Sequence, residues 1–340
     1  GLKNDPVASV IGDDTKRYTT EGVDAESSIA MEYLTGLAAN SSTSYWVMSG
    51  WVYDFTNEIL NSINPPLVNT MASIKPEEEV SLDYKQKTDV ELQKLGVMGI
   101  TMLTQSGDEG TYPNPPQCTK MSPNYPCTSI YITTVGGTSI IPSDNDAPLG
   151  DDAPRVCKER SYNCNCTTAT EEQAMSAVNS NFIVATGGGF SDYAEQPDYQ
   201  QAAVQAYLDS DVKKPSSDTY NSANRAFPDV SAVGSWAFYI NFYNSYKTAG
   251  TDVSTAVWGG IVTLLNNEQL NNDKNALGFI NPLLYQMQQE QPDAFNDITV
   301  GENYIDGCRD LGFVCTTGWD PLTGLGTPNF DVISDYVKKL

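Results

Sequence analysis

Gly99-Ile100-Thr101-Met102-Leu103-Thr104 decides the fold class, because this apolar stretch is predicted to be a buried strand and it directly follows a helical segment. That helix is expected from Asp83 to Leu95, with Gly96 as its stop. Ahead of it, Val68 to Ser73 has the pattern of another strand. Two strands separated by one helix are typical of parallel strands joined by a crossover. The sequence therefore predicts an α/β fold with a mainly parallel sheet.

The same alternation continues on both sides of this unit. Strands are expected at Ala8 to Ile11, Tyr45 to Met48 and Tyr131 to Val135, and helices at Glu26 to Ala38, Asp54 to Ile63 and Val257 to Glu268. Residues 143–180 have no regular pattern and are acidic and rich in Cys and Thr. We interpret residues 1–340 as one domain with a Cys-rich surface excursion at about 143–180.

The composition excludes several classes of function. Forty-three acidic and 19 basic residues give a formal charge of −24, which repels nucleic acid and favours cations or basic partners. No apolar run approaches the roughly 20 residues of a membrane-spanning helix. The chain has no histidine, so histidine-based catalytic triads and histidine-ligated zinc sites are excluded. Any catalysis would have to use carboxylates.

The seven cysteines predict disulfides and a secretory route. Cys118 with Cys127 and Cys308 with Cys315 form two closely spaced groups in loops that suit disulfides. The trio Cys157, Cys164 and Cys166 is interpreted as one disulfide and one leftover thiol, with soft-metal ligation as the alternative. Glycosylation sequons begin at Asn40 and Asn165.

Six short motifs follow one another along the chain. They are Ser106-Gly107-Asp108-Glu109-Gly110, Thr133-Thr134-Val135-Gly136-Gly137-Thr138, Gly187-Gly188-Gly189-Phe190-Ser191, Arg225-Ala226-Phe227-Pro228-Asp229-Val230-Ser231, Gly250-Thr251-Asp252-Val253-Ser254-Thr255-Ala256 and Gly318-Trp319-Asp320-Pro321-Leu322-Thr323-Gly324-Leu325-Gly326-Thr327-Pro328. This ordered set resembles the sedolisins, a family of serine-carboxyl peptidases that includes tripeptidyl peptidases. The resemblance implies a subtilisin-like fold with a parallel sheet of the seven-stranded type, helices on both faces and a C-terminal calcium loop.

The resemblance also implies that two of the four catalytic positions are lost. Glu26 matches the family's general base and Asp108 its oxyanion-hole aspartate, but Ala30 replaces the aspartate that partners the base. Asp252 stands where the family has its nucleophilic serine, and it cannot form the usual acyl-enzyme. Glu32 cannot replace the lost partner, because two residues along a helix it points to another face. Ala256 stands where the family has a proline.

By the same resemblance, the C-terminal motif implies a Ca²⁺ site. Asp297 and Asp320 would supply carboxylates, and Ile298, Thr316 and Gly318 would supply main-chain carbonyls, where Thr316 replaces a usual glycine. Such hard oxygen donors suit calcium. The alternative is an Asp-rich turn without a metal.

These observations favour a non-catalytic sedolisin-like protein, secreted or lumenal, with a structural, binding or assembly role. The alternative is an acid peptidase in which Glu26, Asp108 and Asp252 activate water; three carboxylates in one cleft would either share protons or collect a cation. Family catalytic domains carry more residues before the catalytic helix than the 25 found here. We therefore expect a partner: the chain's own N-terminal fragment, another copy of the chain, or a basic protein.

Overall fold

The computed structural model describes residues 7–12, 25–112, 117–142, 170–177, 179, 184–235, 237–241, 244–305 and 307–340. The helices are α1 (Ala25–Leu37), α2 (Val52–Asn61), α3 (Leu82–Val97), α5 (Gln201–Asp209), α6 (Thr251–Asn271), α7 (Asn281–Glu290) and α8 (Phe330–Val337). The longer strands are β1 (Ser9–Gly12), β2 (Ser44–Val47), β3 (Val68–Met71), β5 (Thr101–Gln105), β7 (Thr133–Pro142), β8 (Thr170–Ala174), β9 (Gly189–Glu195), β10 (Asn224–Phe227), β11 (Val230–Val233), β12 (Ala237–Asn241) and β13 (Asn244–Thr248). Two-residue strands are β4 (Lys75–Pro76), β6 (Asn124–Tyr125), β14 (Phe295–Asn296) and β15 (Thr327–Pro328).

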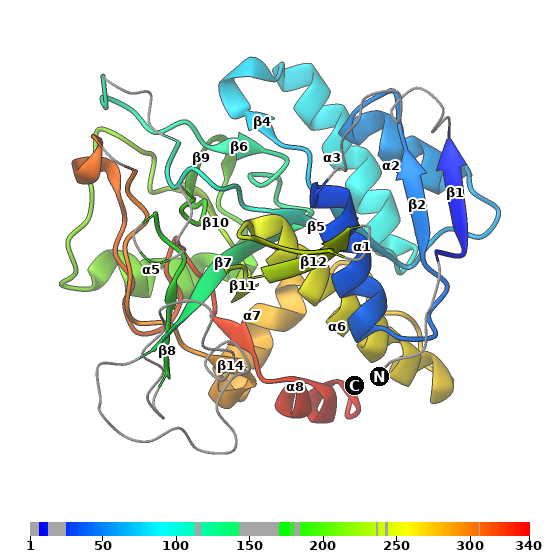
Figure 1. Cartoon of the computed structure of the whole chain (residues 1–340). Helices are drawn as coiled ribbons and strands as arrows, with labels where there is room; N and C mark the ends of the chain where they lie inside the picture. Colours follow the sequence, from blue (N-terminus) through cyan, green and yellow to red (C-terminus); the bar gives the residue numbers. More distant parts are fainter. Residues whose placement is uncertain are drawn as a thin grey trace.

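The central sheet has the strand order β11-β7-β5-β3, and its neighbouring strands are parallel (Figure 1). β8 adds an antiparallel strand beside β7. The predicted mainly parallel sheet is thus confirmed. Its continuity differs from the expectation: among the described residues, β1 and β2 pair in parallel as a separate two-stranded sheet, and β2 does not pair with β3.

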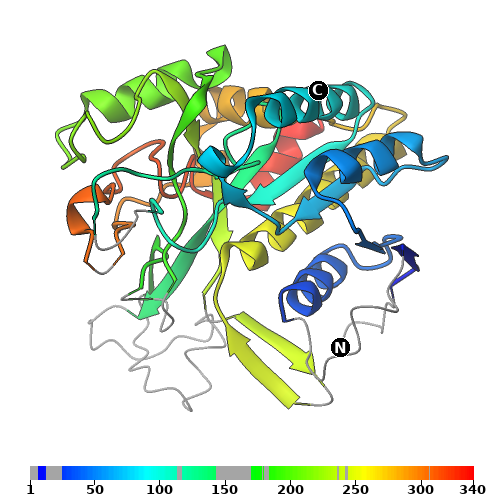
Figure 2. The ribbon, with the colours of Figure 1, turned by 90° about the horizontal axis from the view of Figure 1, so that it is seen from above.

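Helices cover both faces of the central sheet, as expected. Side chains alternate between the faces along a strand, and β5 shows this with two consecutive residues. Leu103 packs in one core with Trp258 of α6, whereas Met102 packs in a second core with Leu92 of α3 and Ile59 of α2. Helix α1 lies against α6, on the outer side of the molecule in Figure 2.

Local signals explain where helix α3 begins. The Ser81 hydroxyl accepts the Tyr84 N–H of α3 at 3.2 Å, and Asp83 and Lys94 lie at the helix ends that favour their charges. Helix α6 begins at Thr251 and not at the predicted Val257. Its first turns are buried on nearly every side, so they lack the amphipathic pattern by which a helix is recognised.

Within the described residues, no helix has the length and apolar character needed to cross a membrane.

A disulfide joins Cys118 to Cys308, which are 190 residues apart in the sequence. The bond therefore links the two cysteine groups to each other, and Cys127 and Cys315 are buried free thiols. The trio at Cys157, Cys164 and Cys166 and the sequon at Asn165 lie outside the described residues, as does most of the predicted excursion. The part of that excursion that is described includes β8.

Candidate functional site

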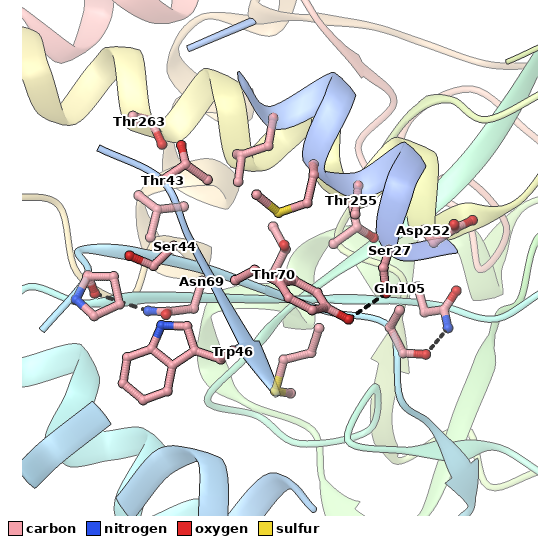
Figure 3. A pocket seen from close by; sticks show the side chains of 18 of the residues that line it. Ser27, Thr43, Ser44, Trp46, Asn69, Thr70, Gln105, Asp252, Thr255 and Thr263 are labelled. Carbon is pink, nitrogen blue, oxygen red and sulfur yellow. Dashed lines mark hydrogen bonds between the residues drawn. The ribbon is translucent and has the colours of Figure 1, made fainter. Parts of the chain in front are cut away.

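Three elements bring the predicted catalytic positions to one cavity. Glu26 lies in the first turn of α1, Asp108 follows the carboxyl end of β5, and Asp252 lies in the first turn of α6. All three, together with Ala30, line a cavity of about 1210 Å³. Figure 3 shows Asp252 at this cavity. Glu32 is not among the residues that line this cavity.

Asp108 is held against the start of α6 by Thr251. Its Oδ1 accepts the Thr251 N–H at 2.8 Å and the Thr251 hydroxyl at 3.0 Å. The same hydroxyl oxygen accepts the Gly107 N–H at 3.1 Å. Burial raises the pKa of Asp108 despite these hydrogen bonds, and the nearby Glu109 raises it further. Asp108 therefore has a higher proton affinity than an exposed aspartate.

Asp252 lies close to Asp108 at the Gly250 position. A Cβ atom added to Gly250 would lie 2.2 Å from Asp252 Oδ1 and 3.1 Å from Asp108 Oδ2, so only glycine leaves room for both carboxyl groups. Asp252 is only 8% exposed. Burial, followed by the charges of Asp108 and Glu26, raises the pKa of Asp252 to about 7. In acidic solution Asp252 is therefore mainly uncharged.

Two side chains of this arrangement differ from those that the resemblance to the family predicts for acyl transfer. Asp252 offers a carboxyl group in place of a hydroxyl nucleophile, and Ala30, one turn after Glu26 on α1, cannot orient that glutamate. In the described part of the chain, no three Asp, Glu, Cys or His residues are grouped as metal ligands. What the geometry does provide is a pair of carboxyl groups with raised proton affinity.

The predicted calcium loop lies at the other end of the sequence, between β14 and β15. Asp297 Oδ2 accepts the Gly318 N–H at 2.9 Å, and Asp320 Oδ2 accepts the Thr316 N–H at 3.2 Å. Both carboxylates thus accept hydrogen bonds from the turn at residues 316–320. Ile298, the next residue after Asp297, is buried. Burial raises the pKa of Asp320 to about 7 and also raises that of Asp297. Such carboxylates, next to main-chain oxygens, fit Ca²⁺ in donor type.

Sequence reasoning missed several residues that shape the cavity. The Thr251 side chain connects Asp108, Gly107 and α6, and Gln105 donates from its side-chain amide to the Ala72 carbonyl at the cavity wall (Figure 3). The N-cap of α6 is Gly250, so the capping rules gave no signal for Thr251, the first residue of the helix. The sequence around Gln105 shows only that a polar residue lies in a buried strand, which does not indicate a role at the cavity.

No family model matches the chain. The chain is 36% identical to physarolisin of Physarum polycephalum, over 99% of this chain and 61% of that protein. It is 34% identical to tripeptidyl-peptidase sed1 of Aspergillus fumigatus, over 81% of this chain and 41% of the relative. It is 32% identical to human tripeptidyl-peptidase 1, over 91% of this chain and 51% of the relative.

Among solved structures, the chain is similar to Pseudomonas sedolisin, a serine-carboxyl proteinase complexed with two molecules of pseudo-iodotyrostatin. The TM-score is 0.70 at 20% identity, and the match covers 98% of this chain and 84% of the sedolisin chain. The chain spans between 41% and 61% of the length of the three relatives named above. The structural match shows the fold, and the sequence matches show the relationship. This chain is therefore a relative of the sedolisins and tripeptidyl-peptidases and has the sedolisin fold.

Proposed function

We propose that this chain is a sedolisin-like protein without acyl-transfer peptidase activity, and that it uses the fold and cleft for a binding, structural or assembly role. The observation that carries the proposal is the pairing of Asp252 with Ala30 in one cavity with Glu26 and Asp108. Serine-type peptide hydrolysis needs a nucleophile and an oriented base at the same place, and this cavity supplies neither as a functional unit.

The purified chain is expected to cleave neither an unfolded protein nor a short peptide between about pH 3 and pH 7, where carboxyl groups change their charge. The measurement is product formation by mass spectrometry over several hours, with an active sedolisin as the positive control. Cleavage that co-purifies with the folded chain at any of these pH values would contradict the proposal.

A second function is favoured by one observation, the approach of Asp252 and Asp108 at Gly250. Two carboxyl groups that share a proton can activate water, as in aspartic proteases. An acid peptidase of this kind would lose its activity in the variant Glu26→Gln if all three carboxyl groups act together, and in Asp252→Asn. Activity that survives Glu26→Gln unchanged would exclude the three-carboxylate mechanism.

We also propose that the loop between β14 and β15 binds Ca²⁺ through Asp297, Asp320 and the carbonyls of Ile298, Thr316 and Gly318. Support comes from the two carboxylates that contact one turn and from the burial of Asp320. Calcium at 100 times its Kd is expected to raise the free energy of unfolding by about 2.7 kcal/mol relative to the chain in EDTA. Thermal or urea unfolding measures this difference.

The variant Asp297→Asn should remove most of this calcium-dependent stabilisation, because it removes one of two charged ligands. Asp293→Asn is the matched control: it changes an exposed aspartate four residues earlier and should leave the calcium effect intact. Equal unfolding curves in calcium and in EDTA for the unsubstituted chain would contradict the metal site.

A secreted or lumenal location is part of the proposal. It is supported by the Cys118–Cys308 disulfide, since such bonds persist in oxidising compartments, and by the exposed sequon residue Asn40. Glycan attached to Asn40 in protein from the native source would be found by peptide mapping.

The acidic charge and the separate β1–β2 sheet support a protein partner, either basic or contributed by another segment or copy of this chain.

A further inference from the structure

Strand β9 is irregular along its second half, where it leaves the ladder with β10. Between the paired residues Phe190 and Glu195, β9 has four residues, whereas β10 has only Arg225 between their partners. Residues 191–194 therefore form a β-bulge. The backbone groups of a bulge lose their ladder partners and need other hydrogen bonds when they are buried.

Glu77 and Ser191 supply these hydrogen bonds. The Glu77 carboxylate accepts the Asp192 N–H at 2.6 Å and the Ser191 hydroxyl at 2.8 Å. The Ser191 hydroxyl oxygen in turn accepts the N–H groups of Tyr193 at 3.0 Å and Ala194 at 2.9 Å. Three consecutive amides of the bulge thus depend, directly or through one hydroxyl, on a carboxylate that is 1% exposed.

A second carboxyl group, on α3, holds a side chain of the bulge. The Tyr193 hydroxyl donates to Asp89 Oδ2 at 2.9 Å. Asp89 Oδ1 accepts the Ser129 hydroxyl at 2.6 Å and the Tyr125 hydroxyl at 3.3 Å. The bulge is therefore fixed on one side to Asp89 of α3 and on the other to Glu77, which lies in the short 3₁₀ helix η1 (Glu77–Glu79).

Lys85 of α3 is the cation between these two carboxyl groups. It is 6% exposed, and its Nζ donates to the Glu77 carbonyl oxygen at 3.0 Å. The same Nζ lies 4.4 Å from the centre of the Tyr193 ring. Burial raises the pKa of both Glu77 and Asp89, and the hydrogen bonds and the charge of Lys85 offset this rise only in part.

The cluster has more negative than positive charge when it is fully ionised. Glu77 and Asp89 carry two negative charges, and Lys85 carries one positive charge. Arg225, opposite the bulge, does not balance the second carboxylate, because it is paired with Asp229 at 2.6 Å. A surplus charge in a buried site is costly, so the cluster favours one bound proton.

The other titratable groups around the cluster do not supply the missing positive charge. Lys120 faces Glu77 from the loop before β6, but it is paired with Asp192 at 2.7 Å. Tyr125, Tyr193 and Cys127 are the remaining neighbours, and burial raises the pKa of each of them. These three groups therefore stay neutral in acidic and neutral solution.

The sign of the pH effect follows from the raised pKa values of the two carboxyl groups. The stability that comes from the bound proton is fully present below about pH 4, where carboxyl groups of the opened segment are also protonated. It is lost as the pH rises through the higher pKa of the closed cluster. Acid therefore tightens the contact of the bulge with η1 and α3, and neutral solution weakens it.

The start of β9 is joined to the segment that contains Asp108. The Ala185 N–H donates to the Asp108 carbonyl at 2.8 Å, and the Gly187 N–H donates to the Gly107 carbonyl at 2.7 Å. A Cβ atom on Gly187 would overlap the Ser106 carbonyl oxygen, so the two segments are in close contact. A shift of β9 therefore acts on the backbone next to Asp108.

We propose that the bulge at residues 191–194 is a pH-sensitive latch, which Glu77, Asp89 and Lys85 close in acidic solution and which opens locally in neutral solution. In acid, one carboxyl group is uncharged and the other is balanced by Lys85. In neutral solution, the surplus charge favours a conformation in which the bulge moves away and water enters. The latch goes beyond the proposed function, because it acts on the cleft whether the cleft binds or cleaves its partner.

The test is amide hydrogen exchange of the 340-residue chain, measured residue by residue by NMR between about pH 4 and pH 7.5. Each rate is divided by the intrinsic rate at the same pH to give a protection factor. The protection factors of Asp192, Tyr193 and Ala194 are expected to fall at least about tenfold over this range, since one pKa unit changes the opening equilibrium tenfold. Amides of β5 and β7 should change much less, because the opening is local.

Variants separate the latch from a merely structural role. Glu77→Gln should make the protection of the bulge independent of pH within about twofold, because Lys85 then balances Asp89 alone. Glu79→Gln is the matched control: it changes an exposed residue of the same η1 helix and should keep the original pH dependence. Lys85→Met should make the fall steeper, approaching two protons instead of one, because both carboxyl groups then need a proton.

Three outcomes would overturn the inference. The first is protection of Asp192, Tyr193 and Ala194 that stays constant from about pH 4 to pH 7.5. The second is an equal fall in the amides of β5 and β7, which would show global unfolding instead of a local latch. The third is a Glu77→Gln variant that folds and keeps the original pH dependence. Glu77→Gln decides the proposal even where Lys85→Met does not fold.

Discussion

The double variant Ala30→Asp with Asp252→Ser is expected to hydrolyse peptides in acidic solution at least about 100-fold faster than the unsubstituted chain. General acid–base catalysis by a positioned carboxylate typically contributes 10²–10⁴-fold, and the introduced serine supplies a hydroxyl nucleophile. Glu26 and Asp108 already line the same cavity, so the variant would place there the four side chains that the resemblance to the family predicts. Initial rates on a peptide substrate between about pH 3 and pH 5 measure the gain.

Single variants provide the controls for this gain. Asp252→Ser alone should gain much less, because Glu26 would still lack a carboxylate one turn away to orient it. Ala30→Asp alone should gain nothing, and adding Glu26→Gln to the double variant should abolish the restored rate. A double variant that folds normally but stays inactive would show that the cleft has diverged beyond these two positions. Ala256, where the family has proline, would then be the next position to change.

The variant Arg225→Met is expected to lower the free energy of unfolding by about 3–5 kcal/mol, because it leaves a buried carboxylate without its cation. Arg225 and Asp229 are both 0% exposed, and their Nη2 and Oδ2 atoms lie 2.6 Å apart. Asp229 also accepts the Thr134 N–H at 2.8 Å and the Tyr285 hydroxyl at 3.2 Å. These two donors cannot neutralise its charge. Urea unfolding followed by tryptophan fluorescence measures the loss.

The exposed pair Lys213–Asp310 is the matched control. Its nitrogen and oxygen atoms are 3.0 Å apart, but the side chains are 61% and 96% exposed. Lys213→Met should therefore change stability by less than about 1 kcal/mol. Adding Asp229→Asn to Arg225→Met should recover part of the loss, since the remaining buried group would be neutral. Equal effects of Arg225→Met and Lys213→Met would contradict the stabilising role assigned to the buried pair.

The sequence was sufficient to predict the strand and helix order, because apolar runs and helical spacing are local properties of the chain. The stretch that begins at Gly99 became β5, and the helix expected from Asp83 to Leu95 became α3 with nearly the same bounds. The start of α6 was less accurate. Thr251 to Ala256 is buried on all sides, and a fully buried helical segment has no polar face to reveal its period.

Tertiary features were harder to predict, because they depend on segments that are distant in the sequence. Family motifs located Glu26, Asp108 and Asp252 in one cavity, but they did not indicate how Thr251 holds Asp108. Nothing in the four residues of β2 shows that they pair with β1 and not with β3. The partners of Cys118 and Cys308 were equally hidden, since spacing along a chain does not fix disulfide connectivity.

That disulfide determines what a single backbone cut can do to the molecule. Every peptide bond between Cys118 and Cys308 lies inside one covalent ring closed by the two sulfur atoms. A protease that cuts the chain once in this interval opens the ring but releases no fragment, so the two pieces remain one molecule until the disulfide is reduced. The interval contains Asp252 and the whole of α6, whereas α1, β2 and β3 lie outside it. A nicked form would therefore keep both walls of the cavity covalently joined.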